Sequence, residues 1–250
     1  MRFYSLPPRH VDYPFLLVTM HHKDELHKRN FKHVILDSGV EIFKNRKQLR
    51  DYPQSFLHRY AQSAQIVSHQ NKGRVWVVVP DYCDDLNRGQ FGDNVTKTLE
   101  NIKEYIGING VEWMPVIQSK YFNRFSFIES CQRLHDVIGD YPRIAIGTVC
   151  KVRNLKFIIY CCQTARKFFP KSWIHAFGLT LLAIPKVKEY LNSWDSLACY
   201  FPRTKFKDWC KQTGLKPFPN ASPFSNSERA EFFFNAYIKR IKDIGVVLED

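Results

Sequence analysis

The sequence lacks any long uninterrupted apolar run. A membrane-spanning helix needs about 18 consecutive apolar residues, and the 250 residues contain no such stretch. The first ten residues, MRFYSLPPRH, also lack the basic and then apolar order of a secretory signal peptide. We therefore expect no membrane partner and a cytoplasmic location.

Cysteine pairs at zinc-binding or redox spacing are also missing. The seven cysteines are scattered, their number is odd, and no CxxC pair occurs. This pattern argues against a disulfide framework and against a compact cysteine-rich zinc site. Five histidines near the N-terminus lack a metal-ligand spacing beside a carboxylate; they are His10, His21, His22, His27 and His33. We expect reduced, mostly buried thiols, exposed or core histidines, no metal and no cofactor.

Acidic residues are few relative to basic ones. The chain has 37 Lys and Arg against 24 Asp and Glu, which gives a net charge of +13 and a pI near 9.4. A basic surface attracts polyanions, above all the phosphate backbones of nucleic acids. The excess is spread along the chain and forms no basic tail, so a generally basic soluble protein is the alternative. The charge favours a nucleic acid, DNA or tRNA, as partner.

Short apolar runs alternate with longer amphipathic stretches. The runs fit parallel strands buried on both faces, and they lie at 15–20, 33–37, 75–81, 113–118, 143–147, 173–178 and 193–198, with an eighth candidate at 245–249. Helical periodicity fills 52–68, 95–106, 128–138, 152–165 and 227–243, with Asp93 or Asn94 as cap of the second helix. The alternation predicts a single α/β domain over residues 1–250, a compact (β/α)8 TIM-like barrel with an irregular eighth unit. A doubly wound open sheet is the structural alternative.

Polar residues or glycines end most of the predicted strands. They are Asp37, Asp81, Gln118, Gly147, His175 with Gly178, and Asp195. In a parallel α/β barrel the reacting groups gather at the carboxyl ends of the strands. We therefore expect three carboxylates and one amide at a single mouth. For each Asp alone, the alternative is a helix cap or a turn former just after a strand.

These strand ends carry a resemblance to a known family. Six short pieces occur in the family's order: Asp37-Ser38-Gly39, Val79-Pro80-Asp81, the run 115–118, the run 144–147, Ala176-Phe177-Gly178 and Trp194-Asp195-Ser196, followed by Pro202-Arg203. Over about residues 34–203 the chain resembles the tRNA-guanine transglycosylases and their DNA-modifying relatives in phages and bacteria. The resemblance implies an enzyme, a pentosyltransferase that replaces guanine in a nucleic acid with a queuosine-related 7-deazaguanine base.

The resemblance also implies roles, which suit the chemistry of an N-glycosidic bond. A carboxylate captures the oxocarbenium-like centre at C1′ of the sugar, and Asp195 holds that place. A second acid protonates the departing purine and later deprotonates the incoming one, and Asp37 holds that place. Asp81 suits the donor groups of guanine, and the amide of Gln118 suits its O6. The residues implied to line the base site are Ser38, Gly39, Asp81, Gln118, Gly147, Thr148 and Gly178.

The segment 201–227 reads as a long loop rich in basic and aromatic residues. Three prolines break any regular element in it. Flipping a base and holding a backbone require cationic and aromatic side chains, and Arg203, Lys205, Lys207 and Trp209 supply both. We expect this loop to bind nucleic acid; a solvated basic surface is the alternative.

The sequence departs from the tRNA enzymes in one respect. Their Cys-x-Cys-x-x-Cys zinc site with a distant His, which lies beyond the nucleophile, is missing, since only Cys199 and Cys210 follow Asp195 and they lack that spacing. This favours DNA over tRNA as substrate, with a partner protein to open the duplex as a further expectation. Two other functions stay open: a catalytically inactive barrel that binds nucleic acid, and a nucleosidase or deoxyribosyltransferase that acts on free nucleosides.

Overall fold

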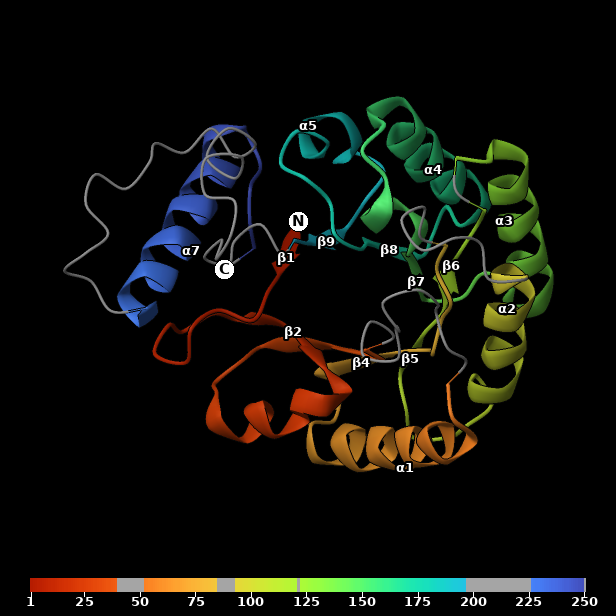
Figure 1. The fold of residues 1–250 in the computed structure, drawn as a ribbon, viewed down its shortest axis with the longest axis horizontal. Helices are drawn as coiled ribbons and strands as arrows, with labels where there is room; N and C mark the ends of the chain where they lie inside the picture. The colour runs from red at the N-terminus through yellow and green to blue at the C-terminus, as the bar shows by residue number, and fades with distance from the viewer. Residues whose placement is uncertain (40–51, 85–92, 121, 197–225, 250) are drawn as a thin grey trace.

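The computed structural model describes residues 1–39, 52–84, 93–120, 122–196 and 226–249. Its strands are β1 (Arg2–Tyr4), β2 (Phe15–Thr19), β3 (His33–Asp37), β4 (Val75–Val78), β5 (Trp113–Met114), β6 (Val116–Ile117), β7 (Arg143–Ile146), β8 (Trp173–Ala176) and β9 (Ser193–Asp195). Its α-helices are α1 (Gln54–Gln70), α2 (Asn94–Tyr105), α3 (Arg124–Ile138), α4 (Leu155–Phe168), α5 (Ile184–Val187) and α7 (Asn226–Asp243), with 3-10 helices η1 (Met20–Lys28) and η3 (Thr148–Lys151). The helices surround the strands (Figure 1).

The strands form two sheets in which every paired neighbour is parallel. One has the order β1-β9-β8-β7-β6 and the other β2-β3-β4-β5. Helices connect most successive strands, so the predicted parallel α/β class is confirmed. The ladders of the described strands make two sheets and not the single closed barrel that we expected.

The two sheets adjoin at both of their borders. At one border β5 and β6 follow each other directly, and only Pro115, which has no N–H to donate, stands between them. At the other border Ser5 forms an isolated parallel bridge with Leu16. There the Ser5 N–H donates to the Phe15 carbonyl at 3.1 Å, and Ser5 O accepts from Leu17 N at 3.0 Å.

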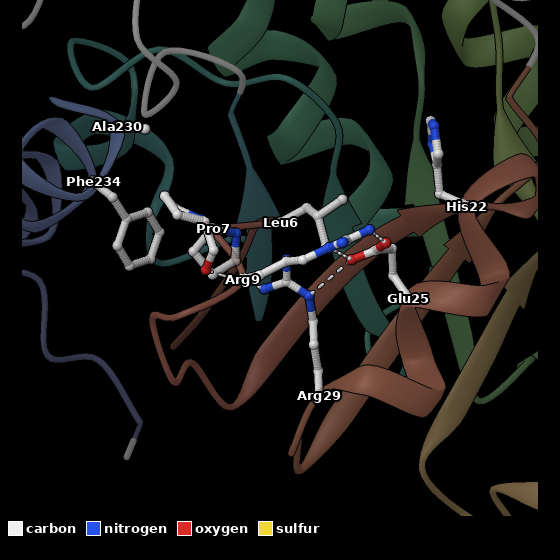
Figure 2. Close-up of a pocket in the computed structure, with 9 residues that line it drawn as sticks. Leu6, Pro7, Arg9, His22, Glu25, Arg29, Ala230 and Phe234 are labelled. Carbon is white, nitrogen blue, oxygen red and sulfur yellow. Dashed lines mark hydrogen bonds and ion pairs between the residues drawn. The ribbon is translucent and has the colours of Figure 1, made fainter. Parts of the chain in front are cut away.

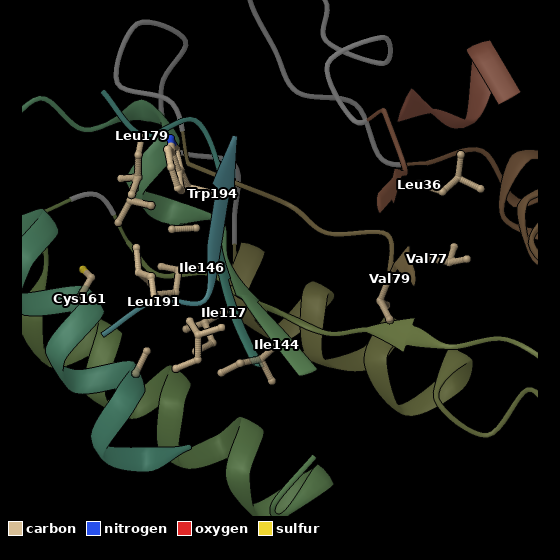
Figure 3. Close-up of a cluster of buried hydrophobic side chains, with 14 of the residues drawn as sticks. Leu36, Val77, Val79, Ile117, Ile144, Ile146, Cys161, Leu179, Leu191 and Trp194 are labelled. Carbon is tan, nitrogen blue, oxygen red and sulfur yellow. The ribbon is translucent and has the colours of Figure 1, made fainter. Parts of the chain in front are cut away.

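Both faces of the strands are buried, as their continuous apolar runs predicted. On β3, Leu36 belongs to the large core cluster between strands and helices, and Ile35 belongs to a second cluster. Figure 3 shows part of the large cluster, in which Ile144 and Ile146 of β7 lie on the same side as Cys161 of α4. The second cluster draws residues from both sheets: Tyr4, Phe15, Ile35, Val78, Met114, Val116 and Ala145. Each sheet therefore has one face towards the helices and one towards the other sheet.

Side-chain caps begin three of the helices, and the sequence predicted one of these caps, at α2. Asp93, Asn123 and Asn154 precede α2, α3 and α4, and each accepts a hydrogen bond from the backbone N–H three residues later. Such caps satisfy backbone donors that the first helical turn leaves open. Of the two cap candidates for α2, the structure selects Asp93.

The eighth strand was predicted at the wrong end of the chain. Residues 245–249 form no strand, and β1 takes the place between β9 and β2. The C-terminal segment instead lies beside the first residue: Met1 N donates to Val247 O, and Glu249 N donates to Met1 O, both at 3.2 Å. Both of these bonds are to Met1, which precedes β1.

Two further expectations concern cysteine and membranes. Cys83, Cys131, Cys161 and Cys162 are buried cysteines, as predicted, and Cys150 is a half-buried one. Burial raises the pKa of the Cys162 thiol to about 12. Within the described ranges, every helix is too short or too polar to cross a bilayer.

Candidate functional site

Three aspartates meet at the carboxyl ends of the strands. Asp37 is the last residue of β3 and Asp195 the last of β9, and Asp81 follows the end of β4. Because the strands are parallel, these ends lie at one rim. Burial, as the largest cause, and then the negative charges of Asp81 and Asp195 together raise the pKa of Asp37 to about 7. The carboxylates are thus close enough to repel one another, as the sequence predicted.

A chain of hydrogen bonds holds Asp195 in place. Its Oδ1 accepts from the Gly178 N–H at 2.9 Å and lies 3.3 Å from His175 Nε2. The other nitrogen of His175, Nδ1, lies 3.0 Å from Ser193 Oγ, which also accepts from Trp173 Nε1 at 2.9 Å. Since Ser193 accepts from Trp173, its own proton is available to His175 Nδ1. Nε2 then carries the proton that is donated to Asp195.

His175 and Ser193 were not assigned a role from the sequence. His175 is one residue before the end of β8 and entirely buried. The signal that could have found it is the two-residue period of a strand. On β8 and β9 this period places Trp173 with His175 on one face, and Ser193 with Asp195 on one face. Together they build the support of the proposed nucleophile.

A second network holds Asp81. Gln118 Nε2 donates to Asp81 Oδ2 at 2.5 Å, and Gln118 Oε1 accepts from Thr148 Oγ1 at 3.2 Å. Thr148 Oγ1 in turn accepts from the Ser119 N–H at 2.8 Å. All these side chains are buried. Both ends of the Gln118 amide, which was expected to address O6 of the base, are therefore engaged by the protein.

Gly147 makes room for that amide. A Cβ atom at Gly147 would lie 2.0 Å from Gln118 Nε2 and 2.8 Å from Val116 Cγ1. From the sequence, we expected the space over Gly147 to be open to a flat base. In the structure the Gln118 side chain occupies it, so a base could enter only after this side chain moves.

The Asp-Ser-Gly piece forms a tight turn at the end of β3. The Gly39 N–H donates to Asp37 Oδ2 at 3.2 Å, and Gly39 has the left-handed φ of 75° that glycine adopts without strain. Ser38 Oγ lies 2.9 Å from the hydroxyl of Tyr52, which donates to the Asp81 carbonyl at 3.2 Å. Tyr52, which the sequence argument missed, thus joins the ends of β3 and β4.

The described cavities lie away from these aspartates. Asp37, Asp81 and Asp195 line none of the three. Figure 2 shows one of about 380 Å³ between the segment after β1, η1 and α7, where Glu25 lies between Arg9 and Arg29.

The segments that follow β3, β4 and β9 fall at least partly outside the described residues. The predicted nucleic-acid contacts lie there as well: Arg203, Lys205, Lys207 and Trp209. In the part of the chain that the structure covers, no group of three or more His, Cys, Asp or Glu side chains is arranged to hold a metal ion.

No family model and no curated protein matches the chain. Among solved structures, the chain is similar to the carboxyl transferase domain of pyruvate carboxylase from Rhizobium etli, solved with 3-bromopyruvate. The TM-score is 0.43 and the identity 12%. The match covers 91% of this chain and 38% of the other, so this chain spans well under half of that structure.

Proposed function

We propose that the protein is a guanine-transglycosylase-like enzyme, a pentosyltransferase that replaces guanine in a nucleic acid with a 7-deazaguanine derivative. The observation that carries the proposal is the pair of carboxylates at one rim in unlike surroundings. Asp37 has a pKa of about 7 because it is buried beside Asp81 and Asp195. Asp195 is held by two donors, the Gly178 N–H and His175. One group is suited to carry a proton at neutral pH and the other to attack.

Asp195 supplies the nucleophile. Both of its hydrogen bonds fall on Oδ1, and within the described residues none falls on Oδ2. Oδ2 attacks C1′ of the nucleotide, and the C1′–N9 electron pair leaves with guanine. The product of this step is an ester between Asp195 and the sugar. Fixing Oδ1 orients Oδ2, which lowers the entropic cost of reaching the attack geometry.

Asp37 moves the proton. In its acid form it gives the proton to the departing guanine, and it becomes a carboxylate. The incoming 7-deazaguanine base then loses its proton to Asp37 and attacks C1′, which releases Asp195. A pKa near 7 keeps both forms of Asp37 populated at neutral pH, as a group that acts first as acid and then as base requires.

Asp81 and Gln118 recognise the base. The N1–H and N2 amine of guanine are donors, so they compete with the Gln118 amide for the Asp81 carboxylate. When Gln118 yields, the space over Gly147 opens to a flat ring and the amide becomes available to O6. Ser38, Gly39, Thr148 and Gly178 border this site. A buried site of this kind discriminates strongly against bases that leave its polar groups unpaired.

The wider proposal concerns the barrel and the polymer. The directly consecutive β5 and β6 and the Ser5–Leu16 bridge support one (β/α)8 barrel made of both sheets. The net charge of +13 supports a polyanionic substrate, with DNA favoured over tRNA. The loop 201–227 holds the strand, and a partner protein opens the duplex. The reaction takes place in the cytoplasm and uses no cofactor.

A base-exchange assay tests the proposal. Labelled guanine is offered to the full chain with DNA, with tRNA and with free nucleosides. Label entering either polymer supports base exchange, and DNA above tRNA supports the preferred substrate. Binding without exchange, unchanged in Asp195→Asn, would make the protein a binding barrel. Turnover of free nucleosides alone would make it a nucleosidase or deoxyribosyltransferase.

A trapping experiment tests the nucleophile. With the incoming base withheld, the nucleic acid should become covalently attached to the protein. Asp195→Asn should abolish attachment, and Asp140→Asn at the exposed surface should leave it intact. Attachment that persists in Asp195→Asn would show that the nucleophile is another residue.

A further inference from the structure

A second cavity lies at the opposite rim, where the strands begin. It has a volume of about 480 Å³. Arg2, Phe15, His33 and Arg143 are the first residues of β1, β2, β3 and β7, and Trp76 is the second residue of β4; all five line it. Because Asp37 and Asp195 end their strands, this cavity is separate from the site of the proposed function. Its size falls in the range of small-molecule sites.

His33 lines this cavity and has a buried ring nitrogen that no hydrogen bond uses. The side chain is buried, its Nδ1 lies 3.0 Å from the Tyr4 hydroxyl, and its Nε2 is buried without a hydrogen-bond partner. The Arg2 side chain donates to the oxygen of Tyr4, so the Tyr4 proton is available to Nδ1. In the tautomer in which Tyr4 donates to Nδ1, Nε2 carries the hydrogen. A buried donor without an acceptor is uncommon in native proteins, and it points to a missing ligand.

Burial keeps that ring neutral. Burial, as the largest cause, and then the positive charges of Arg2 and Arg143 together lower the pKa of His33 to about 3. The imidazole is therefore a neutral donor at physiological pH, surrounded by cations. An anion at Nε2 would satisfy the donor and offset those positive charges.

Two arginines lie flat on aromatic rings beside His33. The guanidinium of Arg2 lies 4.5 Å from the ring centroid of Trp173, and that of Arg143 lies 5.4 Å from that of Trp76. Each has a glutamate partner: Arg2 is 2.6 Å from Glu249 and Arg143 is 3.0 Å from Glu112. A guanidinium has five N–H donors, and these ion pairs leave donors for a ligand.

The lining carries more positive than negative charge. Its positively charged side chains are Arg2, Arg143 and Lys32, and its negatively charged side chains are Glu112 and Glu249. Both glutamates have side chains more than 40% exposed, whereas the Arg143 side chain is 16% exposed. The two glutamate carboxylates therefore face water, whereas the arginine side chains lie deeper in the cavity. The cavity favours a negatively charged guest with a flat part that can lie against the half-buried Trp76.

We propose that this cavity binds a small phosphorylated aromatic molecule of the nucleoside monophosphate class. The phosphate accepts from His33 Nε2 and from the guanidinium groups of Arg2 and Arg143. The base or another flat ring lies along the half-buried Trp76. This binding is independent of the proposed base exchange, because it uses other residues at the other rim.

Calorimetric titration of the full chain tests the site with three probes: a nucleoside 5′-monophosphate, the same nucleoside without phosphate, and inorganic phosphate. The monophosphate should bind most tightly, because it alone uses both the donors and the rings. Inorganic phosphate binding as tightly as the monophosphate would overturn the role of the rings. No saturable binding of the monophosphate would overturn the site.

A variant and a spectroscopic measurement identify the donor. His33→Phe removes Nε2 and should weaken binding by about 10- to 100-fold, the value of a hydrogen bond to a charged group, whereas His69→Gln on exposed α1 should leave it unchanged. In the unmodified protein, monophosphate should shift the His33 ring resonances and raise the pKa of His33. Because this second measurement needs no variant, a folding defect of His33→Phe leaves the test intact. Unmoved His33 resonances under saturating ligand would refute the proposal.

Discussion

The two ends of β3 carry opposite kinds of buried ionisable group. His33 begins the strand, Asp37 ends it, and the two-residue period puts both on the face that Ile35 shares. Burial is the largest cause of the pKa shift at each, lowering the pKa of His33 to about 3 and raising that of Asp37 to about 7. Arginines add to the first shift and aspartates to the second. Burial thus favours the neutral form at both ends, while the neighbours differ in sign.

An apolar layer separates the two rims. Ile35 lies between His33 and Asp37 and belongs to the small cluster drawn from both sheets. The other members come from six more strands, so the layer extends across the interior of the fold. One fold therefore keeps a cationic, aromatic cavity and an anionic cluster apart on shared strands. The predictions below test that division.

The largest effect is expected at the carboxyl rim. Asp195→Asn keeps the size of the side chain and removes the nucleophile, so kcat for base exchange should fall by about 10⁴-fold or more, as for nucleophiles in other enzymes. Steady-state kinetics with labelled guanine measure this. Asp140→Asn, at an exposed side chain, is the control. A decrease of less than tenfold would mean that the chemistry does not lie at this rim.

The next effect is an opposite dependence of stability on pH at the two ends of β3. Asp37 holds its proton more tightly in the folded state than in the unfolded state. Its stabilising contribution to the free energy of unfolding is therefore fully present below about pH 4 and is lost as the pH rises to 7. Relative to the unmodified protein, Asp37→Asn should gain up to about 4 kcal/mol of unfolding free energy between pH 4 and pH 7. Urea unfolding at several pH values measures the difference.

His33 should give the reverse slope. The pKa of His33 is lower in the folded state than in the unfolded state. Its contribution to the free energy of unfolding is therefore fully present above pH 6.5 and is lost as the pH falls towards 3. His33→Phe should therefore lose up to about 3 kcal/mol relative to the unmodified protein as pH rises from 4 to 6.5. Equal slopes in the two variants would contradict the comparison between the rims.

Replacing a glycine by alanine at each of the two rims should change the stability by a smaller amount and for different reasons. Gly147→Ala places a methyl group 2.0 Å from Gln118 Nε2, which should cost about 1–3 kcal/mol through overpacking and weaken the bond to Asp81. Gly73→Ala, beside the cavity at the amino rim, meets no atom within 4 Å but has a φ of +71°, which should cost about 1 kcal/mol. Chemical unfolding measures both costs.

A double variant separates the two causes. Gln118→Ala in the Gly147→Ala background removes the nearest overlap and should recover part of the loss. It should recover nothing in the Gly73→Ala background, where the cost is in the backbone. Equal recovery in both backgrounds would mean that Gln118 does not occupy the space over Gly147.

The smallest effect is expected from the ion pairs of the amino rim. Arg143→Gln breaks the pair with Glu112 and the contact with Trp76, which should cost about 1 kcal/mol or less. The cost should decrease in high salt, because Glu112 is partly exposed. Lys171→Gln, from a pair with Asp140 at 3.8 Å in which both side chains are exposed, should change nothing measurable.

Much of the fold could be read from local patterns. Seven apolar runs became strands, because a strand buried on both faces needs apolar residues throughout. The helices of the predicted ranges formed, with Asp93 as a cap, because capping depends on a side chain and a backbone group three residues apart. The three-residue strand β1 was missed, since three residues show no periodicity and its place depends on its partners β9 and β2.

Part of the candidate site could also be predicted from the sequence, and part could not. The order and parallel direction of the predicted strands indicated that Asp37, Asp81 and Asp195 would lie at one rim. That Gln118 would donate to Asp81 did not follow, since the two residues are 37 apart in the chain. The same holds for His175 beside Asp195 and Tyr52 beside Ser38, which are also distant in sequence.

The sequence alone determined most of the segments that become strands and helices, and which polar groups stand at the strand ends, because these depend on neighbouring residues along the chain. Only the tertiary structure decided which of those groups pair, which donor at the amino rim is left open, and how far each ionisable group is shifted. Those properties depend on burial and on charges brought near by folding, and neither exists until distant segments pack together.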